Sequence, residues 1–151
     1  MAQDKKAIVT NRQALRDYYV EKAYEAGLQL QGNEVKSLRA GKANLKGSFA
    51  KIENGEVFIY NMHISPYKYS REEYDPLRPR KVLLHKAQIK QIEIKLSQQG
   101  YTLVPLKIYF QRGYAKVEVA LARGRKLYDK RKALKEKQAK REMDRAMRRK
   151  K

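Results

Sequence analysis

Alternating apolar and polar residues predict a β-hairpin in residues 48–61 (SFAKIENGEVFIYN). The dipeptide Asn54-Gly55 at its centre supplies the positive φ angles that a type I′ turn requires. Folding about this turn gives one apolar face, on which the cross-strand pairs are Ile52 with Val57 and Ala50 with Ile59. The pairs on the other face are Lys51 with Phe58 and Phe49 with Tyr60. For the aromatic residues of that face we favour packing against a helix over stacking on a base.

A second hairpin is predicted for residues 102–122 (TLVPLKIYFQRGYAKVEVALA), with its turn at Arg112-Gly113. One face is expected to lie in the core and holds Leu106, Ile108, Phe110, Ala115, Val117 and Val119. The opposite face has a solvent-exposed pattern, with Lys107 across from Glu118 and Tyr109 across from Lys116. Opposite charges at directly facing positions stabilise an antiparallel pair.

The remaining pattern predicts two further strands, at residues 18–30 and 80–84, and two short helices. Asn33 can cap a helix over residues 34–39 that ends at Gly41. Residues 85–99 place Ile89, Ile92 and Leu96 on one stripe, and Gly100 follows them. This order predicts a mainly β fold, an OB-like antiparallel β-barrel with flanking short helices. An α+β sandwich is the alternative, because periodicity does not give the strand order.

Charge divides the chain into two parts. Its 151 residues include 36 Lys and Arg against 16 Asp and Glu, a net charge of +20. Residues 123–151 carry 15 basic and 4 acidic side chains and few apolar ones. We therefore expect an OB-like RNA-binding barrel in residues 1–122 and a basic C-terminal tail in residues 123–151. Such a positive charge favours polyanionic partners, with nucleic acid first and an anionic membrane surface second.

The tail has high helix propensity, with neither Gly nor Pro after Gly124. Its like charges repel, and it lacks an apolar stripe that would stabilise an isolated helix. We expect it to be disordered when free and helical when its charge is neutralised by a partner. A merely solubilising basic arm is the alternative, although Tyr128, Met143 and Met147 favour a more specific role.

Catalytic and metal-binding motifs are missing from the sequence. Cys is absent, and His63 and His85 lie far apart without a third ligand in a zinc-binding spacing. The sequence has no glycine-rich nucleotide-binding motif, no serine in a nucleophile motif such as GxSxG, and no isolated pair of carboxylates for acid–base catalysis. We expect no metal, no cofactor and no enzymatic activity. No signal peptide or stretch long enough to span a membrane is visible, so a cytoplasmic location is expected.

Tyrosines interleaved with Lys and Arg indicate RNA as the partner. Eleven tyrosines offer stacking faces beside cations that can bind phosphates. Residues 36–46 (KSLRAGKANLK) present several cations after a helix end and a glycine, although a solvated charged face explains this stretch equally well.

Five long strings carry a resemblance to a known family. In chain order they are GNEVKSLRAGKANLK, NMHISPY, DPLRPRKVLLH, TLVPLKIYF and KVEVALARGRKLYDKRKALKE. They are distributed between residues 32 and 136 in the family's order, and the chain resembles the SsrA-binding protein (SmpB) family. Two positions depart from the family pattern: Gly47 stands where an acidic residue is common, and Phe49 stands where Tyr is common.

The resemblance implies an OB-type barrel that binds the tRNA-like domain of tmRNA (SsrA RNA), one protein per RNA. It also implies delivery of alanyl-tmRNA, with elongation factor Tu and GTP, to stalled bacterial ribosomes for trans-translation. In this ribosome rescue, incomplete peptides are tagged. The family's tail occupies the empty decoding centre of the small subunit and the mRNA channel, where it becomes helical.

Carried over by motif, the residues implied in tmRNA binding are Asn11, Arg12, Arg16, Glu25, Lys36, Arg39, Lys42, Leu83 and His85. The residues implied in the ribosome-engaging tail are Gly124, Arg125, Lys126, Tyr128, Asp129, Lys130, Arg131, Ala146 and Met147. The Tyr128 ring is suited to stacking on a flipped ribosomal base. The competing hypotheses are a structural ribosomal protein, a single-strand RNA chaperone and an RNA-modifying enzyme.

Overall fold

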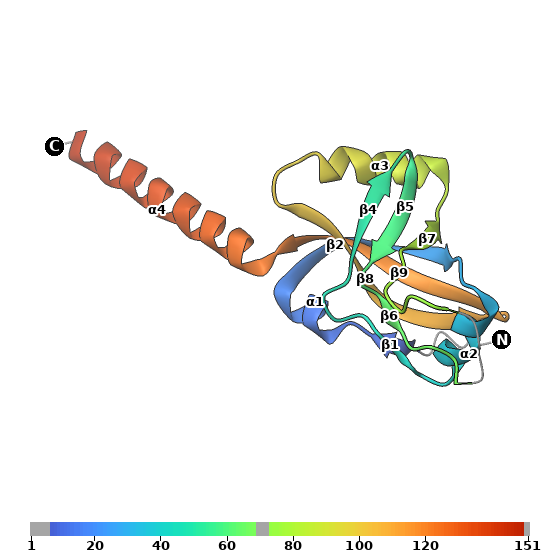
Figure 1. Ribbon diagram of the computed structural model, residues 1–151. Coiled ribbons are helices and arrows are strands. Elements are labelled where there is room, and N and C mark those ends of the chain that lie inside the picture. Colours follow the sequence, from blue (N-terminus) through green and yellow to red (C-terminus); the bar gives the residue numbers. More distant parts are fainter. Residues whose placement is uncertain (1–6, 69–72, 150–151) are drawn as a thin grey trace.

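The computed structural model describes residues 7–68 and 73–149. Within these ranges the elements follow the order β1 (Ala7–Thr10), α1 (Arg12–Asp17), β2 (Tyr18–Leu28), α2 (Gly32–Arg39), β3 (Ala43–Asn44), β4 (Phe49–Glu53), β5 (Glu56–Tyr60), β6 (His63–Ile64), β7 (Arg80–Leu83), α3 (Lys86–Leu96), β8 (Tyr101–Gln111), β9 (Tyr114–Gly124) and α4 (Arg125–Arg149). Figure 1 shows the strands wrapped into one body, from which α4 extends.

Six strands close into an antiparallel ring, in the order β8, β4, β5, β7, β2, β9 and back to β8. Strand β1 adds to this sheet by pairing with β8, and β3 pairs with β6 in a separate two-stranded sheet. The prediction of an antiparallel β body is confirmed. The description of the whole chain as mainly β is wrong, because the 25-residue α4 makes it a mixed α/β protein.

The first hairpin turn has the predicted backbone conformation, and the second turn, at its predicted position, has the same one. Asn54 and Gly55 have φ angles of 52° and 76°, and Arg112 and Gly113 have 52° and 81°. Positive φ at two successive residues gives the turn the twist that the flanking strands need. The predicted pairs of the first hairpin are all present, and in the second hairpin Lys107 faces Glu118 and Tyr109 faces Lys116.

Two residues of the second hairpin were predicted on the wrong side or in the wrong environment. The register between β8 and β9 shifts between Pro105 and Lys107, so the inward-outward alternation changes by one residue there. Leu106 therefore packs outside the ring, in a small cluster with Ala14, Val104, Ala120 and Ala122. Tyr109 does lie on the outer face but is only 1% exposed, because this part of the face is covered.

The helix boundaries follow from their caps. Helix α2 begins earlier than predicted, since Gln31 and not Asn33 is its N-cap, and the Gln31 N–H donates to Glu34 Oε1 at 2.8 Å. The predicted ending at Gly41 is confirmed by its φ of 72°. Helix α3 has His85 as its N-cap, and its Ile89 and Ile92 are buried as predicted. The sequence reasoning missed α1 altogether, along with β1, β3 and β6.

The main core fills the inside of the ring. Strand residues such as Val57, Ile59, Ile108 and Val117 are fully buried there, and Leu38 of α2 and Ile92 of α3 join them from the two flanking helices. Burial of each such side chain contributes on the order of 2 kcal/mol. The core therefore fixes α2 and α3 to the ring and determines where their polar faces point.

Helix α4 has no comparable packing within the described part of the chain. Figure 1 shows it leaving the ring at the end of β9 and extending away from the other elements. Its Leu134, Met143 and Met147 are 57%, 67% and 68% exposed. Among the described residues, no helix is long and apolar enough to cross a membrane.

Candidate nucleic-acid interface

Glu25 and Leu83 lie near one another on the outer face of the ring. Gly27 of β2 is directly opposite Leu83 of β7, and Glu25 is two residues from Gly27 on the same side of the strand. A Cβ placed on Gly27 would be 3.3 Å from the Leu83 Cβ, so Leu83 lies over the glycine. The Leu83 side chain is 53% exposed. An accessible leucine beside a carboxylate is therefore a prominent feature of this face.

The Glu25 carboxylate is positioned by Tyr109 of β8. The Tyr109 phenol donates a hydrogen bond to Glu25, and the Lys107 ammonium lies 5.7 Å from the centre of the Tyr109 ring. Lys107 also forms an ion pair with Glu118 at 3.5 Å. Burial, followed by the bond to Glu25, raises the pKa of Tyr109. The phenol therefore stays protonated at neutral pH and remains a hydrogen-bond donor.

Asn11 lies beneath the surface, at 4% exposure. Its side-chain oxygen accepts a hydrogen bond from the Ala14 N–H at 3.1 Å and so caps α1, and its Nδ2 donates to the Pro105 carbonyl at 2.8 Å. These bonds fix α1 to β8, while Arg12 and Arg16 are exposed on that helix. Within this structure Asn11 thus positions the two arginines and offers little surface of its own.

His85 combines exposure with a structural role. It follows Leu83 by two residues and is the N-cap of α3, where its backbone N–H donates to Gln88 Oε1 at 3.1 Å. The residue is therefore held at the start of α3, next to the outer face that carries Leu83, and its side chain is exposed there.

Lys36, Arg39 and Lys42, three of the four cations of residues 36–46, lie on α2 and the turn after it, not on the outer face of β2 and β7. The Lys36 ammonium lies 5.0 Å from the centre of the Tyr67 ring, and the Arg39 guanidinium lies 4.4 Å from that of Phe110. Lys42 is exposed just after Gly41. Two of these three exposed cations thus make cation–π contacts with aromatic rings.

A buried charge network anchors α2, and sequence reasoning missed it. Glu34 and Arg80 are 1% and 0% exposed, with Arg80 Nε donating to Glu34 Oε2 at 2.9 Å. Arg78 donates to the same carboxylate, and the Tyr74 phenol donates to it at 3.1 Å. Burial raises the pKa of Glu34, but the bonds from Arg78, the Gln31 backbone and Arg80 outweigh it and leave that pKa lowered.

The aromatic strip of the first hairpin is half-buried. The Phe49 and Tyr60 rings stack with their centres 5.7 Å apart, and the Lys51 ammonium lies 5.4 Å from the centre of the Phe49 ring. Phe58 is half-buried on the same face of the hairpin. Packing of this strip against a helix, rather than against a base, stays a prediction.

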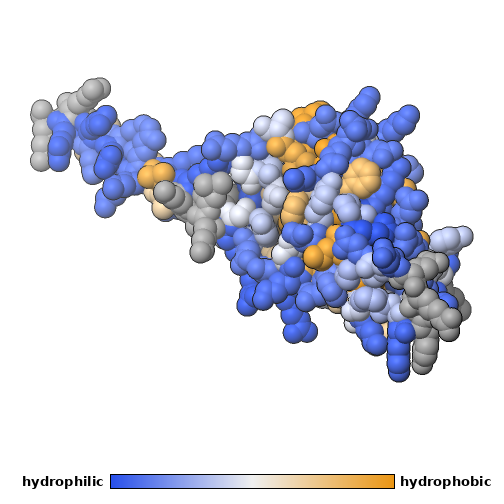
Figure 2. Space-filling view, viewed as in Figure 1, coloured by the Kyte–Doolittle hydropathy of each residue, from blue (hydrophilic) through white to orange (hydrophobic). Residues whose placement is uncertain are grey.

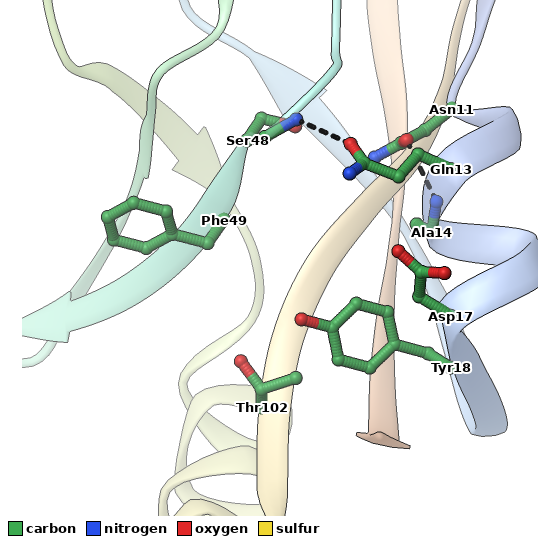
Figure 3. A pocket seen from close by; sticks show the side chains of 9 residues that line it. Asn11, Gln13, Ala14, Asp17, Tyr18, Ser48, Phe49 and Thr102 are labelled. Carbon is green, nitrogen blue, oxygen red and sulfur yellow. Dashed lines mark hydrogen bonds between the residues drawn. The ribbon is translucent and has the colours of Figure 1, made fainter. Parts of the chain in front are cut away.

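A groove of about 360 Å³ lies between α1 and the start of β4. Figure 3 shows Gln13 reaching across to the backbone before Ser48, where Gln13 Oε1 accepts from the Gly47 N–H at 3.1 Å. Gly47 and Phe49, the two positions that depart from the family pattern, both line this groove. No local pattern in the sequence marks the groove, because its walls come from three separate segments.

The first turns of the tail are fastened to the ring. Gly124 is the last residue of β9 and pairs with Tyr18, and the Arg125 guanidinium lies 4.1 Å from the centre of the Tyr19 ring. Arg131 Nη1 donates to the Gln99 carbonyl at 3.4 Å. The side chains of Lys126, Tyr128, Asp129 and Lys130 lie outside the described part of the structure. Ala146 and Met147 are exposed near the far end of α4.

No group of three or more His, Asp or Glu side chains within the described residues could hold a metal ion. The visible surface is mostly hydrophilic, with small apolar patches over the ring (Figure 2). The protein combines a closed antiparallel ring and a net charge of +20 with cations that lie against aromatic rings. These features together are typical of an RNA-binding protein, which is the class of this protein.

The family follows from sequence comparison. The family model described as "SmpB protein" matches residues 8–149. The chain is 56% identical over 144 residues to an SsrA-binding protein of Geobacillus thermodenitrificans, covering 95% of this chain and 93% of that protein. It is also 56% identical to one of Bacillus pumilus, again with 95% of this chain covered and 92% of the relative. The chain belongs to the SmpB family.

A solved structure is similar as well. It is described as "tmRNA-SmpB: a journey to the center of the bacterial ribosome" and superposes with a TM-score of 0.65 at 55% identity. The match covers 76% of this chain and 82% of that one.

Proposed function

We propose that this chain binds tmRNA and acts with it on the ribosome in trans-translation. It does so as an RNA-binding protein and not as an enzyme. The membership in the SmpB family over residues 8–149 is the observation that carries this proposal. The tRNA-like domain is the part of tmRNA that the ring binds, with the ring serving as an OB-like barrel.

The outer face of the ring supports the tmRNA assignment. Arg12 and Arg16 on α1, Glu25 on β2 and Leu83 on β7 are all exposed, and His85 continues the surface onto α3. A folded RNA is recognised by its shape, its phosphates and its unstacked loop bases. A rigid surface that offers cations, one carboxylate and one apolar side chain fits such a target. Lys36, Arg39 and Lys42 extend the cationic area onto α2.

The second part, residues 123–151, engages the ribosome. These residues carry 15 Lys and Arg side chains, and the described side chains of α4 pack little against the ring. Such an exposed, cationic helix fits an RNA-lined channel better than a folded core. It enters the empty decoding centre of the small subunit and the mRNA channel. Away from RNA it loses order, because its like charges repel and tertiary packing contributes little to its stability.

The remaining partners follow from the same role. Alanyl-tmRNA is delivered together with elongation factor Tu and GTP, one copy of this chain per tmRNA, in the cytoplasm. The rival function is that of a structural ribosomal protein, because such a protein would also use a basic tail to bind ribosomal RNA. It would stay on ribosomes stoichiometrically in high salt, whereas a rescue factor would be found at low occupancy.

Sequencing the RNA that copurifies with the full chain from cells tests the proposal. A dominant tmRNA species supports it, and gel-shift titrations should then show that the tRNA-like domain binds more tightly than single-stranded RNA of equal length. Equal affinity for the two RNAs would instead identify a single-strand RNA chaperone.

A further inference from the structure

The groove between α1 and β4 contains polar groups that are open to a ligand. Figure 3 shows the Asp17 carboxylate and the Tyr18 phenol pointing into it from the end of α1 and the start of β2. Thr102 of β8 lines the same space. Among the described residues, none of these three side chains makes a hydrogen bond or an ion pair. Gln13 in contrast is occupied, since it binds the Gly47 N–H at 3.1 Å.

Two aromatic rings border the groove on different sides. Tyr18 stands on the side of α1, and Phe49 stands on the side of β4, with its ring directed away from Tyr18 in Figure 3. Stacking on Tyr60, with ring centres 5.7 Å apart and planes 16° from parallel, fixes the orientation of the Phe49 ring. The open space beside the Tyr18 ring suits a flat ligand, and an unstacked nucleobase is such a ligand.

Residues next in sequence to the groove lining include three exposed cations. Arg12 and Arg16 are exposed on α1, and Lys46 is exposed beside Gly47. None of these cations lines the groove, but each is next in sequence to a residue that does, while the groove itself presents a carboxylate. The carboxylate repels a phosphate and favours a group that donates hydrogen bonds.

We propose that this groove binds a single guanine base of the RNA, splayed out of its stack. Guanine is the base that offers two adjacent donors, N1–H and N2–H, to one carboxylate, here that of Asp17. The Tyr18 phenol can donate to the neighbouring O6, and the flanking cations hold the phosphates. This site deepens the proposed function and rests on it, because it adds base selection to an interface otherwise made of cations and shape.

Nucleoside monophosphates test the site on the full chain. NMR titrations with GMP, IMP, AMP, CMP and UMP would follow the amide signals of Gly47, Phe49 and Thr102. GMP should bind about tenfold more tightly than AMP or IMP, because a two-bond contact discriminates by that order. All five carry the same phosphate, so the difference reports the base alone.

Asp17→Asn tests the carboxylate, and Glu93→Gln is its matched control. Both remove one negative charge at an exposed helix position, but Glu93 lies on α3, outside the groove. Asp17→Asn should abolish the preference for GMP, and Glu93→Gln should preserve it. The amide spectrum of each variant verifies that the fold is retained.

In the titrations, equal affinity for the five nucleotides, undetectable GMP binding or signal changes confined to other parts of the chain would overturn the site. An unchanged preference for GMP in Asp17→Asn would overturn it as well. These failures are separable from failure of the proposed function. Tight binding of the tRNA-like domain by the same protein would still support the proposed function, whereas equal affinity for that domain and for random RNA would contradict it.

Discussion

Arg80 lies completely buried against Glu34, with Arg80 Nε 2.9 Å from Glu34 Oε2. The pair connects β7 to the first turn of α2, the helix that carries Lys36 and Arg39. The Arg80 guanidinium also donates to the carbonyls of Met62 and Pro76. A buried ion pair whose remaining donors are satisfied holds its elements in one arrangement, and removal of one partner leaves the other charge uncompensated.

Replacement of Glu34 by Gln should therefore destabilise the protein by about 3–5 kcal/mol. Urea unfolding of the variant and the parent chain at neutral pH measures this change. Glu93→Gln on α3 is the control, since an exposed side chain of this kind should change the free energy of unfolding by less than about 0.5 kcal/mol. Equal stability of Glu34→Gln and the parent would contradict the role of the network.

The same pair predicts the response to acid. Because the pKa of Glu34 is lowered in the folded state, its contribution to stability is complete above the ordinary value of 4.5 and is lost as the pH falls through the lowered value. The unfolding free energy should decline below about pH 4.5, and part of that decline should be missing in Glu34→Gln. An identical acid profile for both proteins would exclude Glu34 as a source.

Gly27 provides a test of the outer face without a change to any exposed group. In Gly27→Ala the new methyl would lie 3.3 Å from the Leu83 Cβ and 3.4 Å from its Cδ1, so the Leu83 backbone and side chain must both give slightly. Leu83 is 53% exposed and free to move outward, so thermal unfolding should change by only a few degrees. Affinity for the tRNA-like domain should fall several-fold, as in Leu83→Ala. Undiminished affinity in both variants would remove Leu83 from the interface.

The cations of α2 should contribute to RNA binding through phosphates. Neutralising Lys36, Arg39 and Lys42 together should reduce the slope of log affinity against log salt by roughly 0.7–0.9 for each phosphate that the variant no longer neutralises. Replacement of three exposed cations elsewhere, Lys86, Lys90 and Arg112, serves as the control and should leave the slope unchanged. A slope that is equal in the parent and in the α2 variant would place these three residues outside the interface.

The tail should be separable from the ring. Deletion of residues 132–151 should leave affinity for tmRNA largely intact and should abolish peptide tagging on stalled ribosomes. Lys132 lines a groove with Tyr19 and Arg123, but the described residues after it extend away from the ring. Gel shifts and a tagging assay measure the two activities. Tyr128→Ala should lower tagging in the same way if its ring stacks on a ribosomal base. A comparable loss of tmRNA binding on deletion would refute the division into two parts.

Local sequence determined the hairpins of this protein. Asn54-Gly55 and Arg112-Gly113 specify their turns through backbone angles, and alternation then determines which residues pair, so the register at both turns could be predicted. Helix α3 was equally predictable, because an apolar stripe and a following glycine are local signals. The long strings likewise identify the family without any knowledge of the fold.

Tertiary structure decided how these pieces meet. The β8–β9 pair closes the ring, and a bulge at Pro105 turns Leu106 outward, which alternation alone does not reveal. Glu34 and Arg80 are 46 positions apart and Asp17 and Phe49 come from different elements, so neither the buried pair nor the groove has a local signature. Periodicity reports the environment of a residue within its own segment, whereas a site built from several segments exists only once the core has brought them together.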